Sequence, residues 1–252
     1  MSQPTPHPLP LTDLAGVRIV LVEPAGALNV GAIARVIKNL GLHALVLVNP
    51  QCEPLSVEAK LMAVHAVDIL ESAQRVATLP QALQGCTRAI ATTARVRTLA
   101  TPLETPRTAL PWLLEEPGTA ALIFGPEYRG LSNEELNYAQ RFVRIPTSPA
   151  YPSLNLAQAV AICCYELSQS TQLPPSANTY ATTGDYASLD VLEGYYQQLE
   201  ALLLKIGYLY PHTAASRMEK FRQMFNRAQL ENAEVAMLRG VLTQMEWASK
   251  EE

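Results

Sequence analysis

Short runs of apolar and β-branched residues alternate with stretches of helical periodicity through about residue 170. The apolar runs predict buried strands at 17–22, 44–48, 88–92, 119–124 and 142–145. The stretches between and after them predict helices near 29–41, 56–63, 80–85, 107–115, 132–140 and 154–169. This alternation is typical of the α/β class, in which helices cover both faces of a parallel sheet.

A change of composition follows this sheet domain. Segment 171–187 is rich in Pro, Ser and Thr, which predicts a linker. Apolar residues then return at helical spacing in two sets, namely Leu192, Tyr195, Tyr196, Leu199, Leu203 and Ile206, then Leu230, Ala233, Met237, Val241 and Met245. We therefore predict a loose arm over 1–15, a main domain over 16–170 and a helical extension over 188–252. The extension is too small for a large core, so it is expected to pack on the main domain or on a second chain.

Composition indicates a folded protein, with 48% hydrophobic and 17% charged residues. No apolar run reaches the roughly 18 residues of a membrane-spanning helix, so no membrane partner is predicted. The four cysteines contain no C-x-x-C pair, which favours reduced thiols and a cytoplasmic location. The four histidines are scattered along the chain, so no metal site is predicted.

The net charge of −4 does not by itself favour nucleic acid as a partner. Binding depends on local patches, however, and two stretches are locally basic, 75–107 and 205–227. Either stretch is a solvated face or an RNA-binding surface. The second is interleaved with aromatic residues, which suits phosphate contact with base stacking unless these rings only pack the extension; they are Tyr208, Tyr210, Phe221 and Phe225.

Ligands of open parallel sheets bind beyond the carboxyl ends of the strands, so the loops after the strands are the places to search. In the first of these loops Asn29 suits a helix cap. Gly31, Ala32 and Ala34 are small enough for close backbone approach. Arg35 follows one turn later and is either a solvated charge or a group that binds an anion or a developing alkoxide.

Two later loops are also unusual. After the strand at 119–124, Gly125 and Gly130 permit a bent loop that brings backbone amides to a ligand. Ser132 and Glu135 fit a capping box in the same region, whereas Glu127 has no such structural explanation. After 142–145, Ser153 is a natural helix N-cap ahead of Asn155. Singly, none of these loops is specific.

The order N-x-G-x-x-x-R, then F-G-x-E-x-x-G-L, then S-L-N-x-A resembles the three signature motifs of the SpoU/TrmH branch of the SPOUT methyltransferases. The resemblance covers roughly residues 17–170. Within that branch the chain is most similar to the TrmJ-type enzymes, which methylate a ribose in the tRNA anticodon loop. The segments that carry this closer similarity are Thr92–Arg97, Phe225–Ala228 and Leu238–Gly240.

The resemblance implies a C-terminal trefoil knot that binds S-adenosyl-methionine, an RNA substrate that is a tRNA, and a homodimer whose active sites each take residues from two chains. A knot is rare among folds, so only the resemblance supports it. The cofactor is expected against the loops that follow the last three strands. The cofactor-binding residues so implied are Thr92, Thr93, Ala94, Phe124, Gly125, Glu127, Gly130, Ile145, Pro146, Ser153 and Leu154.

The catalytic residues so implied are Asn29, Arg35, Glu127, Ser153 and Asn155. A ribose hydroxyl is a poor nucleophile, so methyl transfer needs in-line placement and stabilisation of the developing alkoxide. Arg35 is always protonated and suits charge stabilisation, with Asn29 orienting it or the ribose. Glu127 is expected to pair with an arginine, in the same chain or across the dimer, or to shape its loop. Ser153 and Asn155 are expected to fix the third loop and to hydrogen-bond the substrate or cofactor.

One position departs from the TrmJ-type pattern. Pro126 stands where those enzymes can carry a basic residue, and Arg129 is the candidate replacement for that charge. Two alternative functions remain, an rRNA 2′-O-methyltransferase and a non-catalytic RNA-binding SPOUT scaffold. The sequence lacks the G-x-G-x-x-G motif of dehydrogenases, the G-x-x-x-x-G-K-[ST] motif of P-loop proteins and the G-x-S-x-G motif of serine hydrolases.

Overall fold

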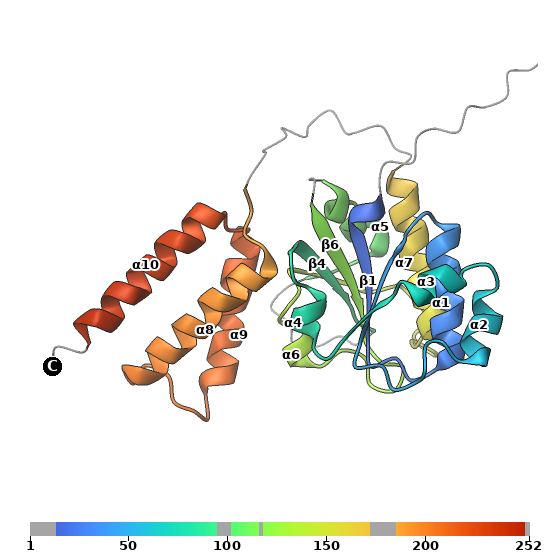
Figure 1. Ribbon diagram of the computed structural model, residues 1–252. Coiled ribbons are helices and arrows are strands. Elements are labelled where there is room, and N and C mark those ends of the chain that lie inside the picture. The colour runs from blue at the N-terminus through green and yellow to red at the C-terminus, as the bar shows by residue number, and fades with distance from the viewer. Residues whose placement is uncertain (1–13, 95–101, 116–117, 172–184, 250–252) are drawn as a thin grey trace, which may run out of the picture.

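The computed structural model describes residues 14–94, 102–115, 118–171 and 185–249, and it shows a sheet domain beside a helical extension (Figure 1). The sheet has seven strands in the order β3-β2-β1-β6-β4-β7-β5, and all of its strand pairs are parallel. The strands are β1 (Val17–Val22), β2 (Ala44–Val48), β3 (Gln74–Val76), β4 (Cys86–Thr92), β5 (Leu103–Glu104), β6 (Thr119–Phe124) and β7 (Arg141–Val143).

Helices cover both faces of the sheet, which confirms the predicted fold class. The helices of the sheet domain are η1 (Leu14–Gly16), α1 (Ala27–Asn39), α2 (Val57–Ala63), α3 (Val67–Glu71), α4 (Leu79–Ala82), α5 (Pro106–Ala109), η2 (Leu110–Leu114), α6 (Asn133–Leu136) and α7 (Leu156–Ser170). The extension consists of α8 (Leu189–Lys205), α9 (Ala214–Ala228) and α10 (Asn232–Ala248). No helix among the described residues is long and apolar enough to cross a bilayer.

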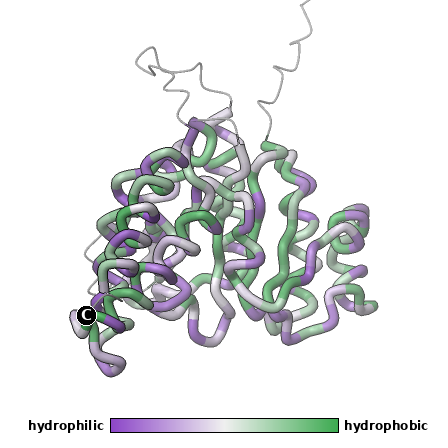
Figure 2. Tube along the Cα trace, turned by 60° about the vertical axis from the view of Figure 1, so that its left-hand side comes forward, coloured by the Kyte–Doolittle hydropathy of each residue, from purple (hydrophilic) through white to green (hydrophobic). Residues whose placement is uncertain are grey.

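Successive residues of a strand pack into two separate hydrophobic cores, one on each face of the sheet, because side chains alternate across a pleated sheet. Ile19 and Leu21 of β1 pack with α1, α7 and η2, whereas Val20 and Val22 pack with α4 and α6. Figure 2 shows hydrophobic stretches running through the strands in the interior. Parallel strands buried on both faces therefore read as continuous apolar runs, which is why the sequence revealed them.

The strands β3 and β5 were missed because they are short and stand at the two edges of the sheet. The helix expected over 132–140 is also wrong in length, since α6 has a single turn. The chain returns to the sheet at β7, and just before this strand the side chain of Gln140 hydrogen-bonds the backbone of β4, as a neighbouring strand would. Its Oε1 accepts the Ala89 amide at 2.7 Å, and its Nε2 donates to the Thr87 carbonyl at 2.9 Å.

Gly31 fixes how closely α1 and α2 approach one another. A Cβ atom at this position would lie 2.1 Å from the Ala59 carbonyl oxygen of α2. The close backbone approach expected at Gly31 is therefore present, and the approaching backbone is that of α2. We expect Gly31→Ala to lower the free energy of unfolding by roughly 1–3 kcal/mol, the usual cost of overpacking, in a urea titration. Gly240→Ala is the control because its Cβ meets open space; equal stability of the two variants would contradict this account.

The extension packs on the α4 and α6 side of the sheet domain (Figure 1). Asp190 of α8 accepts the Gly85 amide at 2.9 Å, and Asn226 of α9 donates to the Asn137 carbonyl at 3.4 Å. Arg222 forms a half-buried ion pair with Glu193. Its guanidinium also lies over two rings, one from each domain, Tyr196 at 4.6 Å and Tyr138 at 5.6 Å. These contacts tie the extension to its own chain.

Candidate active site

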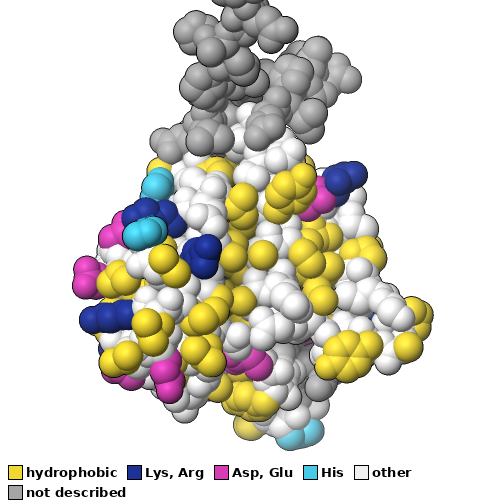
Figure 3. Space-filling view, turned by 90° about the vertical axis from the view of Figure 1, so that its right-hand side faces the viewer, with side chains coloured by type: hydrophobic (Ala, Val, Ile, Leu, Met, Phe, Trp, Pro, Cys, Tyr) yellow, Lys and Arg dark blue, Asp and Glu magenta, His cyan; other side chains and the backbone are white. Residues whose placement is uncertain are grey.

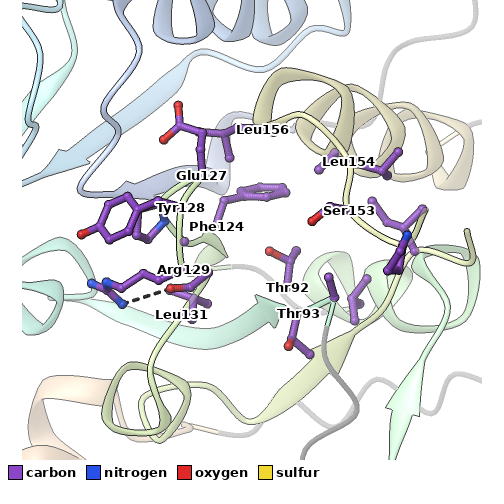
Figure 4. A pocket seen from close by; sticks show the side chains of 18 residues that line it. Thr92, Thr93, Phe124, Glu127, Tyr128, Arg129, Leu131, Ser153, Leu154 and Leu156 are labelled. Atoms are coloured by element: carbon purple, nitrogen blue, oxygen red, sulfur yellow. Dashed lines mark hydrogen bonds between the residues drawn. The ribbon is translucent and has the colours of Figure 1, made fainter. Parts of the chain in front are cut away.

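A cavity lies beyond the carboxyl ends of β4, β6 and β7, where the sequence placed the ligand site (Figure 4). Its volume is ≈ 180 Å³, and it opens to solvent. All of the expected cofactor-binding residues line it except Pro146, which is exposed outside the cavity. The remaining lining residues were not among those expected to bind the cofactor; they are Pro126, Tyr128, Arg129, Leu131, Val143, Pro152, Leu156 and Ala159.

The loop after β6 is a tight turn that two glycines make possible. The Gly130 amide donates to the Pro126 carbonyl at 2.8 Å, and Gly130 has φ +68°, a conformation that side chains disfavour. A Cβ at Gly125 would lie 2.3 Å from the Leu131 amide nitrogen. The bent loop expected from the sequence is therefore present, and it turns its backbone toward the cavity.

Three motif residues from three loops form one hydrogen-bond chain. The Asn155 Nδ2 donates to the Asn29 Oδ1 at 3.0 Å, and the Asn29 Nδ2 donates to the Glu127 Oε1 at 2.7 Å. The other carboxylate oxygen of Glu127 accepts the Ala25 amide at 3.2 Å. The chain joins the starts of α1 and α7 to the loop after β6, so these elements hold one another in register.

Two capping assignments are corrected by this geometry. Helix α1 begins at Ala27 with Gly26 as its N-cap, so Asn29 lies inside the first turn and its side chain is free for Glu127. Helix α7 is capped by Asn155 and not by Ser153, because Asn155 accepts the amides of its first turn. Ser153 is instead exposed and lines the cavity. The capping box of Ser132 and Glu135 is confirmed.

We expect Asn155→Ala to destabilise the protein by about 1 kcal/mol, because the first turn of α7 loses its cap. Asn155→Asp keeps the accepting oxygen and should retain stability, but it places a carboxylate beside Asn29 in place of the donor. Thermal unfolding of both variants tests this. A loss in Asn155→Asp as large as in Asn155→Ala would show that the cap is not the main contribution of this residue.

Glu127 remains ionised at neutral pH. Burial raises the pKa of its carboxyl group, but hydrogen bonds from Asn29 and from the amides of Ala25 and Gly26 outweigh that effect and lower the pKa below its ordinary value. The expected pairing with an arginine does not occur within the described part of this chain. Glu127 therefore presents a negative charge at the cavity rim, fixed by neutral donors.

Arg129 does not supply the free charge that was expected to compensate for Pro126. Its guanidinium is paired with two carboxylates, Glu23 at 2.8 Å and Glu135 at 2.7 Å. Hydrogen bonds from Arg129 lower the pKa of Glu23. Burial raises the pKa of Glu135, but the hydrogen bonds from the same arginine outweigh that effect, so the pKa of Glu135 is also lowered. The positive charge is neutralised inside the structure.

Arg35 lies outside the cavity of its own chain. Its side chain is exposed on α1, and within the described residues it makes no hydrogen bond or ion pair. It follows the exposed Leu28 by seven residues, so the two lie on the same side of the helix, two turns apart. The geometry therefore leaves Arg35 available to a group outside this chain.

The two basic stretches differ in structure. In 75–107, Arg75 pairs with Glu53, Arg107 pairs with Glu166, and Arg88 is buried with a hydrogen bond to the Trp112 carbonyl. The T-x-A-R-x-R segment extends into 95–101, outside the described residues. The described arginines of this stretch are thus mainly structural.

The aromatic residues of 205–227 divide into two groups. Phe221 and Phe225 pack in the core of the extension, as the packing alternative predicted for them. Tyr208 and Tyr210 are 52% and 57% exposed in the turn between α8 and α9. Arg217 lies over the Tyr208 ring at 5.6 Å, and His212 stacks on Tyr210 at 5.9 Å. The exposed rings beside Arg217 and His212 remain a candidate RNA surface.

No group of three or more metal-ligating side chains occurs among the described residues. The structure thus defines a parallel α/β domain with a cavity at its carboxyl edge, lined by the second and third motif loops and by the segment after β4. The chain belongs to the SpoU rRNA Methylase family, whose model matches residues 16–165. A second model, the C-terminal domain of the tRNA methyltransferase TrmJ, matches residues 190–252. The resemblance inferred from the motifs is confirmed.

Similar proteins match nearly the whole chain. The tRNA (cytidine/uridine/adenosine-2'-O-)-methyltransferase TrmJ of Pseudomonas aeruginosa is 38% identical over 239 residues, 90% of this chain and 93% of that protein. The tRNA (cytidine/uridine-2'-O-)-methyltransferase TrmJ of Salmonella typhimurium is 40% identical over 242 residues, 94% of this chain and 99% of that one. The crystal structure of TrmJ from Z. mobilis superposes with a TM-score of 0.82 at 31% identity, covering 92% of this chain and all of that one (100%).

Proposed function

We propose that this protein transfers a methyl group from S-adenosyl-methionine to the ribose 2′-hydroxyl of a tRNA nucleotide in the anticodon loop. The observation that carries the proposal is one cavity lined by the second and third motif loops, with Asn29 of the first motif hydrogen-bonded to Glu127 at its rim. The chain also matches tRNA 2′-O-methyltransferases across both domains. We further propose the trefoil knot of the family, in which the loops after β4, β6 and β7 form the cofactor site, and a cytoplasmic location.

The lining of the cavity suits this cofactor. Its apolar side chains, Ile145, Leu154 and Leu156 among them, fit a flat adenine ring, and the hydroxyl groups of Thr92, Thr93 and Ser153 fit a ribose. Glu127 adds a negative charge at the rim, which suits a cationic sulfonium. When bound, the sulfonium supplies an already activated methyl group, so the transfer requires no metal.

The residues of the chain would then supply position and charge. Arg35 stabilises the developing alkoxide and holds the phosphate or ribose, because its guanidinium keeps its charge and presents a planar fork of donors. Asn29 and Asn155 are occupied by each other and by Glu127, so they position the loops around the reacting groups. Ser153 is exposed at the cavity and is free to hydrogen-bond substrate or cofactor.

A homodimer would bring Arg35 to a cavity. Helices α1 and α7 pack side by side and expose large apolar residues, Leu28, Ile162 and Tyr165. Figure 3 shows hydrophobic groups spread over this face of the molecule. Because Arg35 shares the side of α1 that carries Leu28, pairing through this face places it against the partner chain. We propose that each active site combines one chain's cavity with the partner's arginine.

We therefore expect a stable dimer at micromolar concentration by light scattering. Leu28→Glu and Tyr165→Glu should shift the protein toward the monomer, since each charge would be buried unpaired. Tyr151→Glu is the control, because Tyr151 is 78% exposed on a loop outside these helices. A wild-type protein that stays monomeric would contradict the proposal.

The function is tested by methyl transfer from labelled S-adenosyl-methionine to total tRNA, followed by nucleoside mass spectrometry. A 2′-O-methyl nucleoside should appear with tRNA, and the same nucleoside should be missing from tRNA of a deletion strain. Transfer to rRNA but not tRNA would favour the rRNA methyltransferase. RNA and cofactor binding without transfer would favour the non-catalytic scaffold.

A further inference from the structure

Arg129 bridges two separate elements from within the loop after β6. Its Nη1 and Nη2 donate to the two oxygens of Glu135 at 2.7 and 2.8 Å. The Nη2 also donates to the Glu23 Oε2 at 2.8 Å. Glu23 directly follows β1, and Glu135 belongs to the capping box that begins α6. One side chain thus connects the loop after β6 to the end of β1 and to the start of α6.

The neighbours of Arg129 strengthen this attachment. The Tyr128 hydroxyl donates to Glu23 at 3.0 Å, and the guanidinium lies 5.8 Å from the Tyr128 ring. Glu127 binds Asn29 and the Ala25 amide. Three consecutive side chains therefore hold the loop against the segment that joins β1 to α1.

The two terminal nitrogens of the guanidinium are already occupied within the chain. These two nitrogens carry four hydrogens. The Nη1 atom donates to Glu135 and to the Gly130 carbonyl, the latter at 3.0 Å (Figure 4). The Nη2 atom donates to Glu135 and to Glu23. All four terminal hydrogens have acceptors within the chain. A direct substrate contact is therefore a poor explanation for this residue.

The loop needs such an anchor, because two of its seven residues, Gly125 and Gly130, are glycines that line the cavity. Glycine loses more conformational freedom on ordering than any other residue, so a free loop would populate many shapes. An ion bridge that orders the loop before the ligand arrives reduces the entropy lost on binding.

We infer that Arg129 is a positioning residue that holds the 125–131 loop in its cofactor-binding shape by bridging Glu23 and Glu135. The inference rests on the proposed function of the cavity and deepens it. The bridge acts on the affinity for the cofactor and not on the chemical step, since Arg129 does not reach the residues assigned to the alkoxide.

The test measures S-adenosyl-methionine binding by calorimetry, methyl transfer to tRNA at saturating cofactor, and thermal unfolding without cofactor. Arg129→Gln should raise the cofactor Kd roughly 10-fold, as expected for charged hydrogen bonds, and leave the saturated rate within about threefold. Arg129→Lys should recover part of the affinity, because one ammonium can reach one carboxylate. Glu23→Gln should weaken binding less than Arg129→Gln, and the double variant should bind no worse than Arg129→Gln alone.

Arg107→Gln is the matched control. Arg107 also forms a two-bond pair, with Glu166 at 3.0 and 3.1 Å, but it joins α5 to α7 away from the cavity. Its loss should leave the cofactor Kd unchanged. A wild-type Kd in Arg129→Gln, or an equal rise in Arg107→Gln, would overturn the inference while the proposed function stands. If Arg129→Gln fails to fold, Arg129→Lys and Glu23→Gln decide by the same readouts. A wild-type protein that binds no cofactor would overturn both proposals.

Discussion

Arg35→Ala should lose methyl transfer by roughly two to three orders of magnitude, the usual cost of removing a donor that acts in the transition state. Its affinity for S-adenosyl-methionine should stay near that of the wild type, because Arg35 does not line the cavity of its chain. The free energy of unfolding should also stay within about 0.5 kcal/mol, since the side chain is exposed and makes no hydrogen bond or ion pair within the described residues. Single-turnover transfer at saturating tRNA measures the rate, calorimetry measures the cofactor affinity, and a urea titration measures the free energy of unfolding.

Arg35→Lys should recover little of this activity, because a point charge cannot reproduce a planar fork of donors. The control is Arg107→Ala, which removes another exposed arginine and should keep the normal rate. If the dimer is as proposed, mixing Arg35→Ala with a cavity variant such as Gly125→Ala should restore transfer, because one of the two mixed sites would then be intact. An Arg35→Ala enzyme within a few-fold of wild type would refute the proposed mechanism and leave the fold assignment untouched.

Loss of one exposed ring in the turn between α8 and α9, together with the α9 arginine that lies over it, should weaken tRNA binding by roughly 10- to 100-fold, at about 1–3 kcal/mol for each stacked base. The variant is Tyr208→Ala with Arg217→Ala, which removes a ring and the guanidinium that lies on it. This turn lies on the same lower side of Figure 1 as the carboxyl ends of the strands, so one RNA is able to reach both. The salt dependence of log Kd should also fall by about one, the contribution of one phosphate contact.

Cofactor binding should be unchanged in this variant, because the turn contributes nothing to the cavity. Trp247→Ala is the matched control, as Trp247 is an aromatic residue of the extension that is 55% exposed on α10. Point variants are preferable to truncation after Ser170, because the extension packs on α4 and α6 and its removal would uncover Tyr138. Unchanged tRNA affinity would show that Tyr208 and Arg217 do not contact the RNA.

The local features of the site followed from the sequence because each depends on residues close together in the chain. The capping box of Ser132 and Glu135 lies within four residues, and the bent loop between Gly125 and Gly130 within six. The ends of buried strands could be located for the same reason, and with them the edge of the sheet that carries the cavity.

The errors concern residues whose alternatives look the same in sequence. Asn29 suited the cap of α1 and Ser153 suited the cap of α7. The fold showed instead that Asn29 binds Glu127 and that Asn155 caps α7. Gly31 indicated a close backbone approach, and only the fold showed that the approaching backbone is that of α2. Such choices depend on atoms contributed by distant segments.

The sequence by itself determined the class of fold, the order of the motif loops and the family, since these depend on periodicity and on motif residues at fixed spacing. The tertiary structure alone decided which charges remain available. Arg129 and Arg35 are both arginines in motif segments, yet two carboxylates, one of them more than a hundred residues away in sequence, neutralise Arg129, while Arg35 stays exposed. Electrostatic pairing depends on distance in space, and only the folded chain brings Glu23 and Glu135 to the same guanidinium.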